Sequence, residues 1–82
     1  MSGPFTFRLT VDRSEGALER VLGVVRRRGL GLRRFSASPA DDDRWDIAID
    51  ASASETEAGL ALRQFTALID VRAARCDTAG VQ

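Results

Sequence analysis

The sequence predicts one α+β domain in which four antiparallel strands form a sheet and two helices cover one of its faces. Residues 5–11 and 45–50 alternate apolar and polar side chains, the pattern of a strand with one buried face. Apolar residues in segments 13–28 and 54–69 recur at helical spacing instead. A further strand follows each helix, which gives the element order βαββαβ.

The first half of the chain contains a strand and a helix. Asp12 followed by Glu15 has the form of a capping box, so we expect the helix to run from Arg13 to Arg28. Three arginines then suit the negative end of the helix dipole, and Gly29 offers the left-handed residue that ends many helices. Phe5, Phe7, Leu9 and Val11 share the buried face of the strand, and Ala17, Leu18, Val21, Leu22 and Val25 recur at helical spacing.

The second half contains three strands and the second helix. Residues 30–38 form a strand. The pattern does not decide which face of the sheet Leu32 lies on, because the alternation slips near Arg33 and Arg34. Pro39–Asp43 is a turn, and Ser54 with Glu57 is a capping box that opens the second helix. Residues 71–76 form the last strand, and 77–82 a frayed tail. The inward side chains should be Phe35, Ala37, Trp45, Ile47, Ile49, Ala58, Ala61, Leu62, Phe65, Leu68 and Ile69.

This element order is that of the split-βαβ, or ferredoxin-like, arrangement. It accounts for a single domain over residues 1–82, with a core between residues 5 and 76. A chain this short buries only about 60% of its unfolded surface. We therefore expect a homodimer or a complex rather than a stable monomer.

The composition disfavours a self-sufficient enzyme. The 82 residues include no His, Lys or Tyr, so the side chains that most often perform acid–base chemistry are scarce. All twelve basic residues are Arg and balance twelve acidic ones. Residues 1–34 hold eight Arg and three acids, and residues 35–82 hold four Arg and nine acids, an asymmetry that favours association between chains or between the halves of one chain.

Cys76 is the single cysteine, which excludes an internal disulfide and a paired-cysteine metal site. With no His to activate it, we interpret it as a small strand residue rather than a nucleophile. The N-terminal residues lack the order of a signal peptide, and no apolar run is long enough to span a bilayer. We expect a cytoplasmic location and no membrane contact.

Three other patterns have ordinary structural explanations. The acidic run 41–43 reads as a solvated turn, so no metal site is predicted. Gly29 and Gly31 follow a helix, the wrong end for binding an anion; a cap and a tight turn explain Gly29, but they do not by themselves explain Gly31. RNA binding by this element order needs aromatic residues on the open sheet face, where we expect Thr6, Arg8, Asp46 and Asp50 instead.

The junction between the first strand and helix, residues 12–18, is the most informative stretch for function. Gly16 lies in the expected first helical turn, where it costs of order 1 kcal/mol relative to Ala. Close approach of another backbone or of a small ligand would explain a glycine there. Exposed N–H groups at the helix start would also suit a carboxylate.

Three segments together resemble a known family. GALERVLGVVRRRGL at 16–30, SPADDD at 38–43 and FTALIDVRAARC at 65–76 are similar to ACT domains, the small amino-acid-sensing modules. The resemblance is greatest to the small regulatory subunit of acetolactate synthase (acetohydroxyacid synthase), of the short isozyme II type. It extends over about residues 5–76.

The resemblance implies a non-catalytic subunit that pairs with itself and activates a large catalytic subunit in branched-chain amino-acid biosynthesis. Thiamine diphosphate, Mg²⁺ and FAD would belong to that large subunit, and this chain would hold no cofactor. The alternative is a free-standing ACT sensor that regulates another enzyme. We expect Arg8 to lie near Asp46 or Asp50 and these charges to help orient the partner.

The resemblance also implies an effector pocket at the dimer interface, between the first loop of one chain and the second strand of its neighbour. Valine-sensitive members carry Asn where this chain has Arg13 and Gly31, so we expect valine to have weak or no effect. The pocket residues implied are Arg13, Ser14, Glu15, Gly16, Ala17, Leu18, Gly29, Leu30, Gly31 and Leu32.

Overall fold

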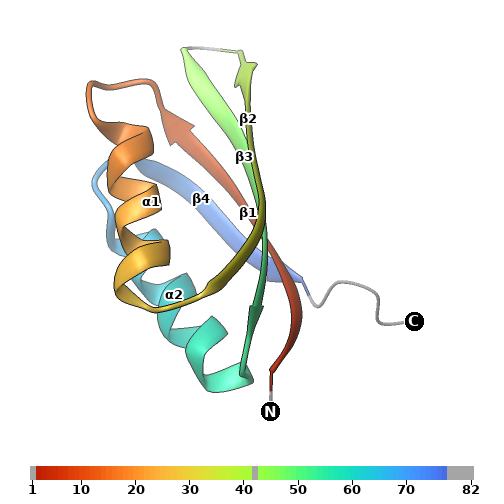
Figure 1. Cartoon of the computed structure of the whole chain (residues 1–82). Helices are drawn as coiled ribbons and strands as arrows, with labels where there is room; N and C mark the ends of the chain where they lie inside the picture. Colours follow the sequence, from red (N-terminus) through yellow and green to blue (C-terminus); the bar gives the residue numbers. More distant parts are fainter. Residues whose placement is uncertain (1, 42, 78–82) are drawn as a thin grey trace.

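The computed structural model describes residues 2–41 and 43–77 and has the predicted element order (Figure 1). Apolar and polar residues alternate along the strands, and apolar residues recur at helical spacing along the helices. Each element therefore has one apolar side to bury. The elements are β1 (Gly3–Asp12), α1 (Ala17–Arg27), β2 (Gly31–Ala40), β3 (Arg44–Ala53), α2 (Glu55–Ala67) and β4 (Val71–Asp77).

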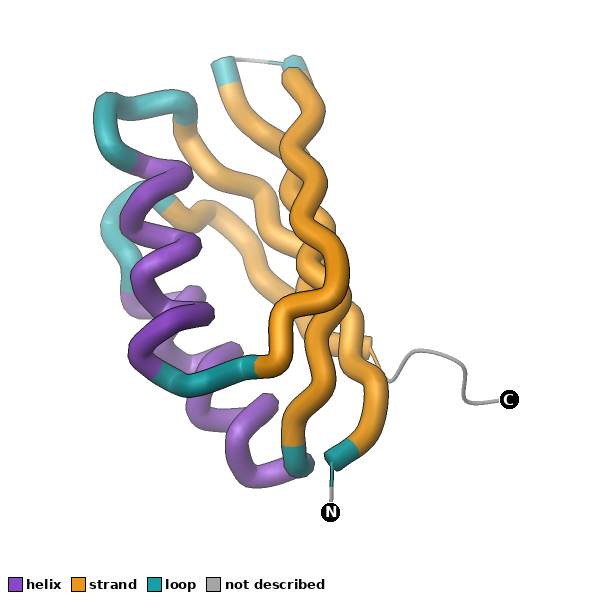
Figure 2. Tube along the Cα trace, in the orientation of Figure 1, coloured by secondary structure: helices purple, strands orange, loops and turns teal. Residues whose placement is uncertain are grey.

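The four strands form one antiparallel sheet in the order β2-β3-β1-β4, and both helices lie on the same face (Figure 2). β1 therefore lies beside β3, as expected, with Phe7 opposite Ile49 on the helix side and Arg8 opposite Ala48 on the open side. The edges of the sheet are β2 and β4. This is the ferredoxin-like arrangement that the sequence predicts.

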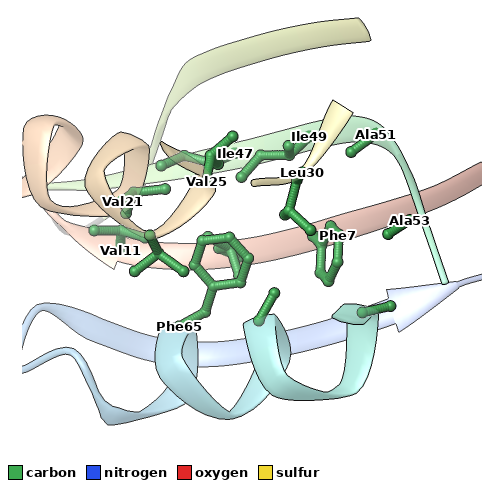
Figure 3. Packing of buried hydrophobic residues seen from close by; sticks show 14 of the residues in the cluster. Phe7, Val11, Val21, Val25, Leu30, Ile47, Ile49, Ala51, Ala53 and Phe65 are labelled. Carbon is green, nitrogen blue, oxygen red and sulfur yellow. The ribbon is translucent and has the colours of Figure 1, made fainter. Parts of the chain in front are cut away.

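The core lies between the sheet and the helices (Figure 3). At its centre the rings of Phe7 and Phe65 meet edge to face, with centroids 5.3 Å apart and an interplanar angle of 62°. Such aromatic pairs contribute about 0.5–1.5 kcal/mol beyond the burial of their area. The largest fully buried side chains are Phe7, Phe65, Ile49, Val11, Val21 and Val24.

The two predicted capping boxes have different outcomes. In α2, Ser54 Oγ accepts from the backbone N–H of Glu57, and the Glu57 carboxylate accepts from that of Ser54, which confirms the prediction. The box at Asp12 is wrong, because α1 begins only at Ala17 with Gly16 as an N-cap that makes no side-chain hydrogen bond. Asp12 ends β1 instead, and its carboxylate accepts hydrogen bonds from two arginines of other strands.

The C-terminus of α1 follows the prediction. Gly29 has φ +66°, which an L side chain rarely adopts. Its N–H donates to Arg26 O at 3.2 Å, and the Leu30 N–H donates to Val25 O at 3.1 Å. These two bonds form a Schellman motif, which satisfies carbonyls that the helix itself leaves unpaired.

β2 is longer than expected, because Pro39 and Ala40 pair with Trp45 and Arg44 and so belong to the strand rather than to a turn. An edge strand tolerates proline because its outer N–H needs no partner. The slip predicted near Arg33 is a β-bulge between Leu32 and Arg34. Because of this bulge, Leu32 and Phe35 both pair with core-facing residues of β3.

Two expectations near the C-terminus need correction. Ile69 is 85% exposed rather than packed, because α2 ends at Ala67 and Leu68 already has extended backbone. Asp77 belongs to β4 rather than to a frayed tail, since it pairs with Thr6 of β1. The rest of the expected tail, 78–82, lies outside the described residues, as does Asp42 of the acidic run. Within the described ranges, neither helix has the length and apolar character that crossing a bilayer requires.

Candidate functional site

The loop between β1 and α1 is shaped by Gly16. Its φ of +79° lies in the left-handed region, which turns the chain from the strand into the helix. The N–H of Ala17 donates to Ser14 O at 3.1 Å, and that of Arg20 donates to Gly16 O at 3.0 Å. Gly16 is therefore required by the backbone conformation, independently of any ligand.

A buried carboxylate holds this loop in place. The side chain of Asp70 is 7% exposed and accepts hydrogen bonds from Arg20 Nε, at 2.6 Å, and from Ser14 Oγ. The Arg20 bond and then the Ser14 bond hold the pKa of Asp70 below its ordinary value, against the opposing effect of desolvation. The bond to Asp70 also raises the pKa of Arg20. The backbone takes part as well, since the Asp12 N–H donates to Asp70 O at 2.8 Å.

The guanidinium of Arg20 occupies the space beside Gly16. Its Nη2 donates to Glu15 O at 2.8 Å, and a Cβ added at Gly16 would lie 2.8 Å from its Nη1. The room that the missing Cβ leaves is thus used within the chain. A ligand carboxylate approaching the start of α1 would meet this guanidinium as well as the backbone N–H of Leu18.

Arg13 joins the same loop to the turn between β2 and β3. Its guanidinium carbon lies 5.1 Å from the centroid of the Trp45 ring, a cation–π contact. Its backbone N–H donates to Asp43 O at 3.0 Å, and its side chain lies 3.9 Å from the Asp43 carboxylate. The loop is therefore fixed from both sides, by Asp43 and Trp45 and by Asp70.

Asp12 forms a second charge cluster at this end of the sheet. It accepts from Arg72 Nε of β4 at 2.8 Å and from Arg44 Nε of β3 at 3.3 Å. The Arg72 hydrogen bond is the main cause of its lowered pKa, and the same pair raises the pKa of Arg72. Neither this cluster nor the Asp70 cluster was found from the sequence. The one available signal was Asp70 itself, an acid that interrupts an apolar pattern.

The other predicted pocket residues lie at the opposite end of α1 (Figure 1). Arg13–Leu18 precede or begin the helix, and Gly29–Leu32 follow it. An 11-residue helix is about 16 Å long, so one chain does not bring the two groups together. Leu30 is buried in the core, whereas Gly31 and Leu32 are exposed at the start of β2.

The predicted contact residues Arg8, Asp46 and Asp50 all lie on the open face of the sheet. Arg8 pairs with Ala48, so both acids are its diagonal neighbours on β3. Within residues 2–41 and 43–77, Arg8 forms no ion pair with either. Asp50 accepts a hydrogen bond from Thr6 Oγ1 at 2.8 Å instead.

The environment of Cys76 does not activate its thiol. Cys76 is half-buried against the core on β4, and burial raises the pKa of its thiol, which keeps it protonated. Among the described residues, no group of His, Cys, Asp or Glu has the arrangement of a metal site. The arginines of the first loop and of the open face offer charge-assisted hydrogen bonds to anions.

Comparison with known proteins gives a family and a fold. The family model of the ACT domain matches residues 13–74. No curated protein matches the sequence. Among solved structures, the ACT domain of GTP pyrophosphokinase from Chlorobium tepidum is similar with a TM-score of 0.82 and 12% identity, over 94% of this chain and 100% of that chain.

Two further structures have the same fold. An uncharacterised protein from Thermotoga maritima matches with a TM-score of 0.80 and 11% identity, over 96% of this chain and 99% of that chain. A homoserine dehydrogenase from Thiobacillus denitrificans matches with a TM-score of 0.79 and 14% identity, over 95% of this chain but only 17% of its own. The same fold thus occurs both in a chain of similar length and within a much longer enzyme.

Proposed function

This chain belongs to the ACT domain family, and on that premise we propose that it is a non-catalytic regulatory subunit of acetolactate synthase. It binds and activates the large catalytic subunit, which holds thiamine diphosphate, Mg²⁺ and FAD. The observation that carries the proposal is the combined resemblance of segments 16–30 and 65–76 to small subunits of that enzyme. The fold puts the first segment in and around α1 and the second across the end of α2 and β4.

A homodimer is the first requirement of this function, and α1 carries a surface that suits a second copy. Leu22 is 39% exposed and lies beside Gly23 in a shallow groove that Glu19 and Arg26 also line. If two α1 helices pack antiparallel about an axis between Leu22 and Gly23, each Glu19 faces Arg26 of the second copy. The surface is then self-complementary in shape and charge, as a two-fold interface must be.

β2 supports the same dimer. It is an edge strand, so its outer N–H and C=O groups are available to pair with another strand. Leu32 is 46% exposed although it pairs with core-facing Ala51. A second copy joined along β2 would cover Leu32 and continue the sheet.

This symmetry also forms the effector pocket that the resemblance implies. The antiparallel α1 pair that sets Glu19 against Arg26 brings the start of one helix to the end of the other. Gly16 of one chain then lies near Gly29 of the second copy, and Arg13–Leu18 lies near the start of the partner's β2. The two groups of residues, about 16 Å apart within a chain, become one site between two chains.

The open face of the sheet is the proposed contact with the large subunit. It carries charges of both signs, with Arg8 on β1 and Asp46 and Asp50 on β3. Complementary charge across an interface affects association rate and register more than stability. The helix side is covered by α1 and α2 (Figure 2), which leaves this face of the monomer accessible.

A free-standing amino-acid sensor is the second candidate. The family match over residues 13–74 supports it, because ACT domains are amino-acid-sensing modules and the match does not specify which enzyme is regulated. This candidate predicts an amino acid bound at the α1 dimer interface in the absence of any large subunit. Co-purification of the chain with the large subunit separates the two functions, because only the regulatory subunit of acetolactate synthase would bind it.

The experiment that tests the regulatory subunit is analytical ultracentrifugation of the chain with and without a large subunit. We expect a dimer alone and joint sedimentation with the large subunit. Leu22→Glu should give a monomer, whereas Leu60→Glu, which changes a leucine of 40% exposure on α2, should leave the dimer intact. A folded wild-type monomer that does not sediment with the large subunit would contradict the proposal.

A further inference from the structure

The open face of the sheet contains a hollow of about 360 Å³ between β1 and β4. Arg8 and Thr10 of β1, Ala73 and Arg75 of β4, and Asp46 of β3 line it. The hollow lies next to a β-bulge, where Thr10 pairs with Ala73 and Val11 with Val71, so that Arg72 has no pairing partner on β1. Its lining combines small side chains with charged ones, a composition that would suit a small polar molecule.

Two of the residues that line this hollow, Arg8 and Arg75, are arginines on neighbouring strands. Arg8 and Arg75 are directly opposite in the β1–β4 register, where like charges are destabilising. Arg8 forms no ion pair with any residue that the structure describes. Arg75 has only Asp77, at 3.7 Å on the exposed edge. An anion between the two guanidinium groups would remove their repulsion and accept hydrogen bonds from both.

Asp46 defines the other side of the hollow. It lies opposite Thr10, diagonal to Arg8, and its carboxylate makes no hydrogen bond or ion pair within the described part of the chain. A carboxylate there repels a second anionic group and accepts from a donor. The complementary ligand therefore has a negative group at one end and a hydroxyl or other donor at the other.

We propose that this hollow binds a small carboxylate, held by Arg8 and Arg75, whose second polar group donates to Asp46. The site goes beyond the regulatory function proposed above, because it needs neither a second copy nor the large subunit. It is also separate from residues 13–18 and 29–32, which lie at the two ends of α1. Arg8 and Asp46 are also proposed contacts of the large subunit, so the small carboxylate and the large subunit would compete for this face.

The test is an NMR titration of the ¹⁵N-labelled full chain with acetate and with 3-hydroxybutyrate, using chloride at equal ionic strength as the reference. We expect saturable shifts of the Arg8 and Arg75 side-chain N–H signals and of the Ala73 amide. 3-Hydroxybutyrate should bind more tightly than acetate because only it can donate to Asp46. Chloride should give no saturable shift.

Three variants define the site. Arg8→Gln and Arg75→Gln should each weaken 3-hydroxybutyrate binding by about tenfold, as expected for the loss of one charge-assisted hydrogen bond. Asp46→Asn should reduce the preference for 3-hydroxybutyrate over acetate. Arg63→Gln, on the exposed side of α2, is the matched control and should bind like the wild type.

Thermal unfolding gives an independent readout. Without ligand, Arg75→Gln should melt at a slightly higher temperature than the wild type, because the repulsion from Arg8 is removed. It should also lose the increase in melting temperature that 3-hydroxybutyrate gives the wild type. Shifts that do not saturate, that spread equally over the other arginines, or that saturate with the wild-type affinity in Arg75→Gln would overturn the proposal.

Discussion

The Nε of Arg20 donates a 2.6 Å hydrogen bond to Oδ2 of Asp70, which joins the first turns of α1 to the turn before β4. The carboxylate is almost fully buried, whereas the guanidinium reaches it from the surface. Ser14 donates to the other carboxylate oxygen, so the β1–α1 loop is bound to a residue distant in sequence. The conformation of the proposed effector loop therefore depends on Asp70.

Asp70→Asn should lower the free energy of unfolding at neutral pH. The hydrogen bonds from Arg20 and Ser14 hold the pKa of Asp70 below its ordinary value of 3.8. The folded protein thus binds this proton less tightly than the unfolded chain. Its contribution to stability is complete above about pH 5 and is lost as the pH falls through the folded-state pKa.

Urea unfolding of wild type and Asp70→Asn between neutral and acidic pH measures this contribution. The two free energies should differ at neutral pH and converge below pH 3.8, the ordinary value. Asp41→Asn, in the exposed turn after β2, is the matched control and should follow the wild type. A difference that stays constant down to low pH would show that the ionised form of Asp70 is not responsible.

Gly16→Ala should destabilise the protein by about 1–2 kcal/mol, since an L residue pays that amount in the left-handed region. The new Cβ would also displace the end of Arg20. Gly59→Ala is the matched control, because a Cβ there meets nothing within 4 Å in the interior of α2. It should stabilise by about 0.5–1 kcal/mol. Equal effects of the two substitutions in thermal unfolding would refute this explanation of Gly16.

Local signals in the sequence predicted most of the fold. Ser54 and Glu57 are three residues apart and form their capping box without help from the rest of the chain. The same pattern failed at Asp12, because Arg72 and Arg44, 60 and 32 residues away, bind its carboxylate. No local pattern reveals such partners, because they depend on strand register and loop position.

The same distinction applies to the candidate site. The sequence singled out Gly16 and Gly29, and both have the positive φ that requires glycine. It did not show that Asp70 binds Arg20, because that contact joins residues 50 positions apart. It also did not show that Arg20 fills the space at Gly16, because that contact arises only after the loop has formed. The opposition of Arg8 and Arg75 likewise follows only from the observed register.

Valine should have weak or no effect on acetolactate formation by the assembled enzyme. The Arg13 side chain already contacts the Trp45 ring and the Asp43 carboxylate, and Gly31 has no side chain to bind an amino acid. Arg13→Asn combined with Gly31→Asn should introduce valine sensitivity, because valine-sensitive members carry Asn at both positions. The new side chain at position 31 fits, since a Cβ there would lie 3.4 Å from Ser52. Arg13→Ala combined with Gly31→Ala controls for the loss of the cation–π contact. Micromolar binding of valine to the wild-type chain in calorimetry would contradict this prediction.

The most direct test of the regulatory function is the rate of acetolactate formation from pyruvate by a large subunit, titrated with this chain. Thiamine diphosphate, Mg²⁺ and FAD are present throughout, so that only the small subunit varies. We expect the rate to rise and then saturate at a fixed ratio of the two chains, with Arg8→Glu requiring more chain to reach saturation, particularly at low salt. A rate that stays at that of the large subunit alone at every ratio would contradict the account.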